Sequence, residues 1–317
     1  EKFKNLIIYD AVNKILNRNK ILAPFLYKEN YKNHYIEIQD FGNKTISQIL
    51  KKRGIDKLIY FKKIINLLIK IQSIKHKKIK NFRNKIYKIP KYNKEILIKE
   101  ANLFCDWYAK INLPKSQRNK FTKDFKKITK QLTLKLKLKN NVFVHRDFHV
   151  SNLMKVKKQI GILDSQDALF GNKAYDLASL IDDVRLKTSF SLKNSIYNYY
   201  VQLNKKKINE NYFRNDFEIL SVLRNLKIIG IFSRLSKRDK KHKYLKFIPY
   251  AWKLIEGRIN NNIKFTYLKN ILDIPNATFV NLQYGDVDNE IQAINNQIKN
   301  KVLNLKDINM FNDIESM

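Results

Sequence analysis

The chain has 317 residues, with 64 Lys and Arg against 28 Asp and Glu, so its formal net charge at pH 7 is +36. This length fits one large or two ordinary domains, and a hydrophobic fraction of 44% excludes intrinsic disorder despite the charge. No apolar run approaches the ~20 residues of a membrane-spanning helix. The single cysteine, Cys105, excludes an internal disulfide, so we expect a protein of the reducing cytoplasm.

The basic charge is mostly lysine and is spread along the whole chain. Basic surfaces attract nucleic acid, but only 11 of the basic residues are Arg, the residue that binds bases and phosphates through paired hydrogen bonds. Lys occurs here together with abundant Asn and Ile, which is typical of A/T-rich coding. We therefore expect no nucleic-acid partner.

The first part of the chain predicts helices around one strand. Apolar residues recur every three or four positions in residues 1–20, which favours a helix, and residues 34–39 alternate as a strand does before Asp40-Phe41-Gly42. Asp56 can cap a further helix, residues 75–93 read as a solvated loop, and helices follow at 94–110 and 116–137. The expected buried side of the helix after Asp56 comprises Leu58, Ile59, Phe61, Ile64, Ile65, Leu68 and Ile71.

Two short apolar strands then each deliver an acid at their carboxyl end. Residues 142–144 run into His145-Arg146-Asp147, and residues 160–163 run into Asp164. The remainder predicts helices at 175–187, 190–206, 214–236 and 243–260, then a strand at 278–283, a helix at 286–299 and a strand at 301–305. The last three elements have a β-α-β order.

The strongest chemical signal is the segment from His145 to Asn152, with Asp164 twelve residues later. It fits the pattern H-R-D-x-x-x-x-N, followed by a metal-binding Asp on the next strand, which is typical of phosphotransferases. Asp147 can orient or deprotonate an acceptor hydroxyl. The oxygens of Asn152 and Asp164 suit Mg²⁺, which neutralises phosphate oxygens. The pattern therefore predicts phosphoryl transfer.

This segment and residues 161–183 (GILDSQDALFGNKAYDLASLIDD) resemble the aminoglycoside-phosphotransferase/choline-kinase superfamily. Within it, they are most similar to the bacterial anomeric kinases of N-acetylmuramate and N-acetylglucosamine, with further support from residues 35–42, 95–108 and 224–239. The resemblance covers about residues 1–262. It implies an α+β, protein-kinase-like fold with an incomplete N-lobe, a mainly helical C-lobe and a partial α/β tail. The corresponding domains would be 1–56, 57–265 and 266–317.

The resemblance also implies a role for individual residues. Asp147 would be the catalytic carboxylate, and Asn152 and Asp164 would bind magnesium. ATP would lie against the backbone of the hinge, which comprises Ile38, Gln39 and Asp40.

Further residues would support this site or face the sugar. His145 would be a buried scaffold residue, and Asp176 would brace the catalytic loop through backbone hydrogen bonds. Four residues could equally contact the sugar or support the residues that contact it: His149, Gln166, Asp167 and Arg224.

The chain departs from the superfamily in two places. Nothing before residue 5 corresponds to the strands that cover the nucleotide phosphates and carry a basic residue, so we expect an incomplete small lobe. A truncated kinase and a degenerate pseudokinase both fit, and the intact Asp147, Asn152 and Asp164 favour truncation. Ser165 stands where the superfamily usually has Phe, and we expect looser packing there without the loss of a ligand.

The end of the chain is a separate question. Residues 267–317 are similar to a piece of the C-terminal glycosyltransferase-like region of certain tetratricopeptide-repeat proteins. An unspecific helix–strand appendage is an equally good interpretation.

The leading functional hypothesis is ATP-dependent phosphorylation of the anomeric hydroxyl of an N-acetylated amino sugar, as in cell-wall sugar recycling. An aminoglycoside or amino-alcohol phosphotransferase is the alternative within the kinases. A non-catalytic nucleotide- or nucleic-acid-binding kinase remnant is the alternative from another class. The expected partners are the sugar and ATP, with no membrane, and the oligomeric state stays open.

Overall fold

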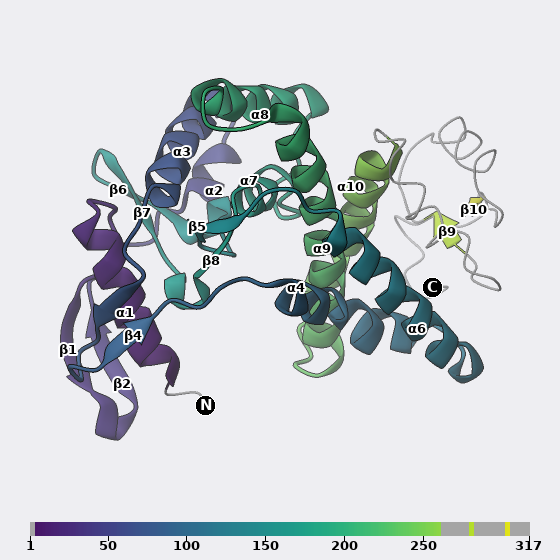
Figure 1. Ribbon diagram of the computed structural model, residues 1–317, viewed down its shortest axis with the longest axis horizontal. Helices are drawn as coiled ribbons and strands as arrows, with labels where there is room; N and C mark the ends of the chain where they lie inside the picture. The colour runs from purple at the N-terminus through teal and green to yellow at the C-terminus, as the bar shows by residue number, and fades with distance from the viewer. Residues whose placement is uncertain (1–3, 261–278, 282–301, 305–317) are drawn as a thin grey trace. The chain divides into compact units, whose positions relative to one another are not determined.

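The computed structural model describes residues 4–260, 279–281 and 302–304 (Figure 1). The chain forms two compact units: the first comprises residues 1–97 and 134–221, and the second comprises residues 98–133 and 222–317. Helices α4 (Lys94–Ala101) and α9 (Glu210–Lys237) contribute to both units.

The first unit alternates helices with two-stranded antiparallel sheets. It pairs β1 with β2, β3 with β4, β5 with β8 and β6 with β7. Besides α4 and α9, its elements in chain order are α1 (Lys4–Arg18), β1 (Leu26–Asn30), η1 (Tyr31–Asn33), β2 (Tyr35–Ile38), α2 (Ile46–Leu50), α3 (Lys57–Gln72), β3 (Lys78–Lys80), β4 (Ile86–Lys88), β5 (Asn140–Val144), η3 (Val150–Asn152), β6 (Leu153–Val156), β7 (Gln159–Ile162), η4 (Ser165–Asp167), β8 (Leu169–Asn172), α7 (Tyr175–Ile181) and α8 (Phe190–Asn204).

Helices α1 and α3 follow the apolar periodicity of the sequence. Val12, Ile15 and Leu16 of α1 are at most 1% exposed, because residues three and four apart share one helical face. The side chain of Asp56 accepts the backbone amide of Ile59 at 3.2 Å, so the predicted cap of α3 is confirmed.

One member of the expected buried face of α3 was wrong. Ile59 is 52% exposed, whereas Phe61 is 1% exposed. Two residues correspond to about 200° of helical rotation, so Ile59 lies on nearly the opposite side from Phe61.

The segment 75–93 is not the loop that its lysines suggest, because it contains the β3–β4 hairpin. Ile79 is 4% exposed and packs into the core between two exposed lysines. The side chain of Asn81 accepts the backbone amides of Arg83 and Lys85, which closes the turn. A three-residue strand is too short for its alternation to be recognised in the sequence.

The strands predicted before the two acids are confirmed as β5 and β7, but their partners were not predicted. β5 pairs with β8, with Val144 opposite Leu169, and β7 pairs with β6, with Ile162 opposite Leu153. β6 and β8 are each four residues long; β6 contains Lys155, and β8 ends with Gly171 and Asn172, so neither shows a clear alternation in the sequence.

The second unit is mainly helical. Its core contains Phe104, which stacks on Phe125 with ring centroids 5.4 Å apart and meets Trp252 edge-on at 5.6 Å. Burial raises the pKa of Cys105 to about 12, with Asp106 adding to the shift, so this thiol stays protonated. Besides α4 and α9, the helical elements of this unit are the π-helical turn η2 (Phe104–Ala109), α5 (Lys110–Asn112), α6 (Lys115–Leu134), η5 (His242–Phe247) and α10 (Ile248–Asn260).

Two short strands near the end of the chain pair in parallel. β9 (Phe279–Asn281) lies beside β10 (Val302–Asn304), with Val280 opposite Leu303. Parallel neighbours need a crossover connection, so this pairing agrees with the predicted β-α-β order. The predicted helix at 286–299 lies outside the described residues.

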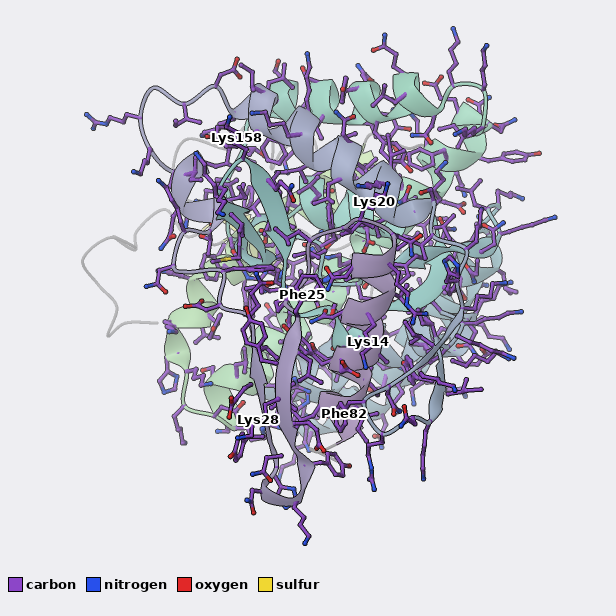
Figure 2. All side chains as sticks on the ribbon, turned by 90° about the vertical axis from the view of Figure 1, so that its left-hand side faces the viewer. Lys14, Lys20, Phe25, Lys28, Phe82 and Lys158 are labelled. Carbon is purple, nitrogen blue, oxygen red and sulfur yellow. The ribbon has the colours of Figure 1, made fainter. Side chains whose placement is uncertain are left out.

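Lysines project from several elements of the first unit, as Figure 2 shows. The labelled Lys14 belongs to α1, Lys28 to β1 and Lys158 to the β6–β7 turn, while Lys20 follows α1. On this face, the lysines are distributed over the fold.

Among the described residues, no helix combines the length and the hydropathy that crossing a lipid bilayer requires.

Gly230 provides a test of the packing inside the second unit. A β-carbon at this position of α9 would stand 2.6 Å from the backbone nitrogen of Phe104 and closer still to the carbonyl group of Leu103. Backbone cannot move aside cheaply, so we expect Gly230→Ala to lower the free energy of unfolding in urea by about 3 kcal/mol. Gly257→Ala in α10 is the control: its β-carbon would meet no atom of the described residues within 4 Å, and we expect stabilisation of about 0.5–1 kcal/mol. Equal effects of the two changes would contradict the close contact.

Candidate functional site

The β6–β7 hairpin brings Asn152 and Asp164 to the same end of the sheet. Asn152 directly precedes β6, Asp164 follows β7 by one residue, and Leu153 pairs with Ile162 at that end. The backbone amide of Leu163 donates to the carbonyl oxygen of Asn152 at 2.9 Å. The two turns that carry the predicted metal ligands are therefore hydrogen-bonded to each other.

Asp176 holds the start of the HRD loop, the name used below for residues 145–152. Its carboxylate accepts the backbone amide of His145 at 2.7 Å and that of Arg146 at 3.0 Å. Asp176 lies at the start of α7 and is completely buried. Hydrogen bonds to a charged acceptor are stronger than neutral ones, so this pair fixes the backbone just before Asp147.

Inside the HRD loop, the backbone of Asp147 accepts two hydrogen bonds. The side-chain nitrogen of Asn152 donates to its carbonyl oxygen at 3.1 Å, and the amide of His149 donates to the same oxygen at 3.0 Å. Because Asn152 uses its nitrogen in this bond, its side-chain oxygen is the atom that can ligate a cation. The Asp147 side chain is half-buried.

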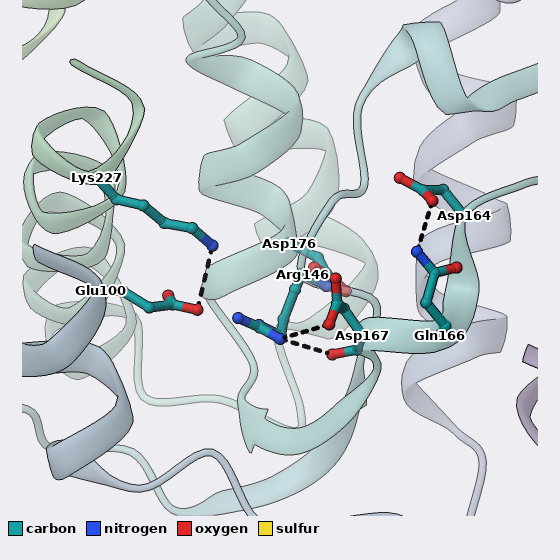
Figure 3. Close-up of polar contacts among 7 residues, drawn as sticks. All are labelled: Glu100, Arg146, Asp164, Gln166, Asp167, Asp176 and Lys227. Carbon is teal, nitrogen blue, oxygen red and sulfur yellow. Dashed lines mark hydrogen bonds and ion pairs between the residues drawn. The ribbon is translucent and has the colours of Figure 1, made fainter. Parts of the chain in front are cut away.

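Asp164 occupies a turn with an unusual backbone. Its φ of 62° and ψ of 43° are left-handed, a conformation that Asp tolerates better than most residues. The residue is exposed, and its Oδ1 accepts a hydrogen bond of 2.7 Å from the side chain of Gln166 (Figure 3). The carboxylate therefore faces solvent while a neighbour restrains its orientation.

His145 is a buried residue whose ring is influenced by the charges of Asp147 and Asp164. It is completely buried, and burial lowers its pKa, while the charges of Asp147 and Asp164 act in the opposite direction. Its ring meets Phe148 edge-on, with centroids 6.3 Å apart. The charges of both carboxylates therefore favour the protonated ring, and burial opposes it more strongly.

The donor set fits magnesium. Within the described part of the chain, no group of three or more His, Cys, Asp or Glu side chains could hold a metal ion. Mg²⁺ does not need such a group, because it binds through one or two protein oxygens and completes its shell with water and phosphate oxygens. Asn152 and Asp164 provide an amide oxygen and a carboxylate of this kind.

The hinge residues comprise the last residue of β2, Ile38, and the two residues that follow it, Gln39 and Asp40. The amide of Gln39 donates to the carbonyl of Phe25 at 2.8 Å, and Asp40 Oδ1 accepts the amide of Gly42 at 2.7 Å. A cavity of about 480 Å³ opens at Gln39, and its remaining lining residues are Leu22, Val156, Lys157, Lys158 and Gln159. Ile38 ends β2 and is 37% exposed.

The four candidate sugar contacts have different surroundings. Gln166 and Asp167 lie in the η4 turn. The side chain of Gln166 donates a hydrogen bond to Asp164, and the side chain of Asp167 accepts one from Arg146. His149 is 6% exposed, and Arg224 is 4% exposed in the part of α9 that belongs to the second unit. His149 lies in the HRD loop and Gln166 and Asp167 lie in the η4 turn, while Arg224 belongs to the second unit. A contact with the sugar stays a prediction for all four residues.

Two contacts of this region could not be read from the sequence. Ser165 is completely buried and donates from its hydroxyl to Asn13 Oδ1 of α1 at 2.5 Å, and the Asn13 amide nitrogen donates to the Pro24 carbonyl at 3.0 Å. Arg146 donates to the carbonyl oxygen of Asp167 at 3.2 Å and to its Oδ1 at 3.3 Å. The only sequence signal for the first contact is a polar residue on the buried face of α1.

Comparison with known proteins finds phosphotransferases and sugar kinases. Residues 64–200 match the phosphotransferase enzyme family. The N-acetylmuramate/N-acetylglucosamine kinase of Pseudomonas aeruginosa is 27% identical over 256 residues, which are 79% of this chain and 72% of that protein. The protein of the same name from Neisseria meningitidis serogroup B is 31% identical over 225 residues, which are 68% of this chain and 64% of that protein. The resemblance to these kinases is confirmed, and the chain spans about two thirds of their length.

A solved structure shows the fold. The choline/ethanolamine kinase family protein of Mesorhizobium loti superposes with a TM-score of 0.55 at 10% identity, covering 84% of this chain and 82% of that one. The predicted α+β, protein-kinase-like fold is therefore confirmed.

Proposed function

Because residues 64–200 belong to the phosphotransferase enzyme family, we propose that the chain transfers the γ-phosphoryl group of ATP to a hydroxyl of an N-acetylated amino sugar. The observation that carries the reaction type is the set of Asp147, Asn152 and Asp164 on two turns joined by a hydrogen bond. The names of the two relatives support the sugar as the acceptor. The anomeric hydroxyl is the most specific part of the proposal.

In the proposed reaction, Asp147 orients the acceptor hydroxyl and takes its proton as the hydroxyl oxygen bonds to the γ-phosphorus of ATP and the bond to the leaving ADP breaks. Asn152 Oδ1 and the Asp164 carboxylate would hold Mg²⁺, which when bound would neutralise the negative charge of the phosphate oxygens. Asp176 keeps the loop in place through two backbone amides. His145 stays buried as a scaffold for both carboxylates.

ATP is proposed to lie against the backbone of Ile38, Gln39 and Asp40. Two contacts support this position: Thr45 bridges to Met154 of β6, and the amide of Lys155 donates to the carbonyl of Lys44 at 2.9 Å. The chain just after the hinge therefore adjoins the strand that begins next to Asn152.

The remaining parts of the proposal concern organisation and compartment. The division into an N-lobe and hinge at 1–56, a C-lobe at 57–265 and a tail at 266–317 stays a prediction. We place the reaction in the cytoplasm because ATP is the proposed donor and the single cysteine is a buried free thiol.

The test is a substrate panel with the protein in the full length that its gene encodes, supplied with ATP and Mg²⁺. We expect N-acetylmuramate and N-acetylglucosamine to yield sugar phosphates whose phosphorus resonance is that of an anomeric phosphate. The methyl glycoside of N-acetylglucosamine is the matched control, because its anomeric hydroxyl is blocked and it should not react. Phosphorylation of this glycoside, or faster turnover of an aminoglycoside, would contradict the proposal.

A further inference from the structure

The guanidinium group of Arg146 connects the HRD loop with the η4 turn (Figure 3). It donates to both the backbone carbonyl and the side-chain Oδ1 of Asp167, at 3.2 and 3.3 Å. It also lies over the ring of Tyr92, 5.5 Å from the centroid, and Tyr92 is 1% exposed. The guanidinium group thus packs on the buried ring of Tyr92 and is hydrogen-bonded to Asp167 of the η4 turn.

The backbone contact matters more than the ion pair. The Asp167 side chain is 55% exposed, so its charge is screened by water and the pair contributes little to stability. The bond to the Asp167 carbonyl, in contrast, restrains the main chain of the turn that starts immediately after Asp164. The side-chain nitrogen of Gln166, in the same turn, donates a hydrogen bond to the Asp164 carboxylate.

The backbone of Arg146 has a conformation that is unfavourable for a residue with a long side chain. Its φ is 73°, a left-handed value that suits glycine and is costly for a long side chain. Its amide is held by Asp176, so the loop requires this conformation whatever residue stands there. A residue without a side chain would fit the backbone better, which indicates that the guanidinium group provides something that the fold alone does not need.

We propose that Arg146 is a positioning residue: through Asp167 it holds the η4 turn, and with it the Asp164 carboxylate, in a fixed place relative to the HRD loop. This inference rests on the proposed function, because it gives Asp164 its importance. In this role Arg146 touches neither the sugar nor the phosphate. It lowers the freedom of a carboxylate that must meet a metal ion, and misplacing such a group by about 1 Å can cost on the order of 100-fold in rate.

The test is Arg146→Gly. Glycine suits the backbone, so we expect the urea midpoint to stay the same or rise, while amide hydrogen exchange of residues 164–168 in the ligand-free protein becomes about 10-fold faster. We also expect kcat to fall by about 10–100-fold, with the KM of the sugar changed less than about 3-fold. Lys240→Gly is the matched control, because Lys240 has a φ of 56° in the exposed turn between α9 and η5 and should show neither the faster exchange nor the lower kcat.

Two further variants separate the parts of the contact. Arg146→Lys keeps the charge but has a shorter side chain without the Nη1 atom that donates to both oxygens of Asp167, so we expect the same direction of change as in Arg146→Gly. Asp167→Asn keeps the backbone carbonyl as an acceptor and is expected to cost less than either change at Arg146. Exchange and kcat as in the wild type for both Arg146 variants would overturn the proposal, as would a loss of the same size in Lys240→Gly. If the wild type phosphorylates no sugar, the proposed function fails, while the exchange measurement still supports or overturns the positioning role.

Discussion

Asp147→Asn is expected to lower kcat by on the order of 10³-fold, because an amide cannot accept the proton of the acceptor hydroxyl. The two side chains have nearly the same shape, and the hydrogen bonds that the Asp147 backbone receives from His149 and Asn152 do not depend on its carboxylate. The protein should therefore stay folded and still bind nucleotide. The loss corresponds to about 4 kcal/mol of transition-state stabilisation.

The measurement is initial-rate kinetics with N-acetylmuramate and N-acetylglucosamine, with the urea midpoint and ADP binding determined on the same preparation. Asp239→Asn is the matched control: this carboxylate pairs with Arg238 outside the HRD loop and the η4 turn, and its removal should leave kcat unchanged. Near-wild-type turnover of Asp147→Asn would show that Asp147 does not act on the acceptor proton.

Asp164→Asn is expected to abolish the response to magnesium and to lower kcat by on the order of 10³-fold. Removing the charge removes the carboxylate oxygen that Mg²⁺ prefers, and metal ions stabilise transferring phosphoryl groups by several kcal/mol. Asn adopts left-handed backbone readily and still offers an oxygen to Gln166, so the turn should keep its conformation.

This second variant is best followed by binding as well as by rate. Thermal stabilisation by ADP should depend on Mg²⁺ in the wild type and should become independent of it in Asp164→Asn. Retention of magnesium-dependent stabilisation would mean that Asp164 is not a ligand, even if the rate falls for another reason. The two variants therefore distinguish a role on the acceptor from a role on the metal.

The helical elements of this chain were accessible from the sequence because a helix repeats its signal over many residues. The apolar positions of α1 and α3 recur over at least four turns, and Asp56 stands at the cap of α3. The hairpin β3–β4 and the strands β6 and β8 were missed because three or four residues contain too few alternations to identify a strand. Ile59 was assigned to the same buried side as Phe61, although about 200° of helical rotation separates the two residues.

The residue types of the candidate site were determined by the sequence alone. Asp147 and Asn152 lie five residues apart in one loop, and Asp164 follows the next predicted strand, so short-range spacing is enough to recognise the set. The resemblance to the amino-sugar kinases depends on the same local motifs, and comparison with known proteins confirms it.

Only the tertiary structure decided what holds these residues in place. The resemblance already implied that Asp176 braces the HRD loop, 31 positions away, but it implied neither the contact of Asp167 with Arg146 across 21 positions nor that of Ser165 with Asn13 across 152. Periodicity and motif spacing report on neighbours along the chain, whereas these contacts form because packing brings distant segments together. The sequence therefore identifies the groups that would perform the chemistry, and the fold selects the groups that position them.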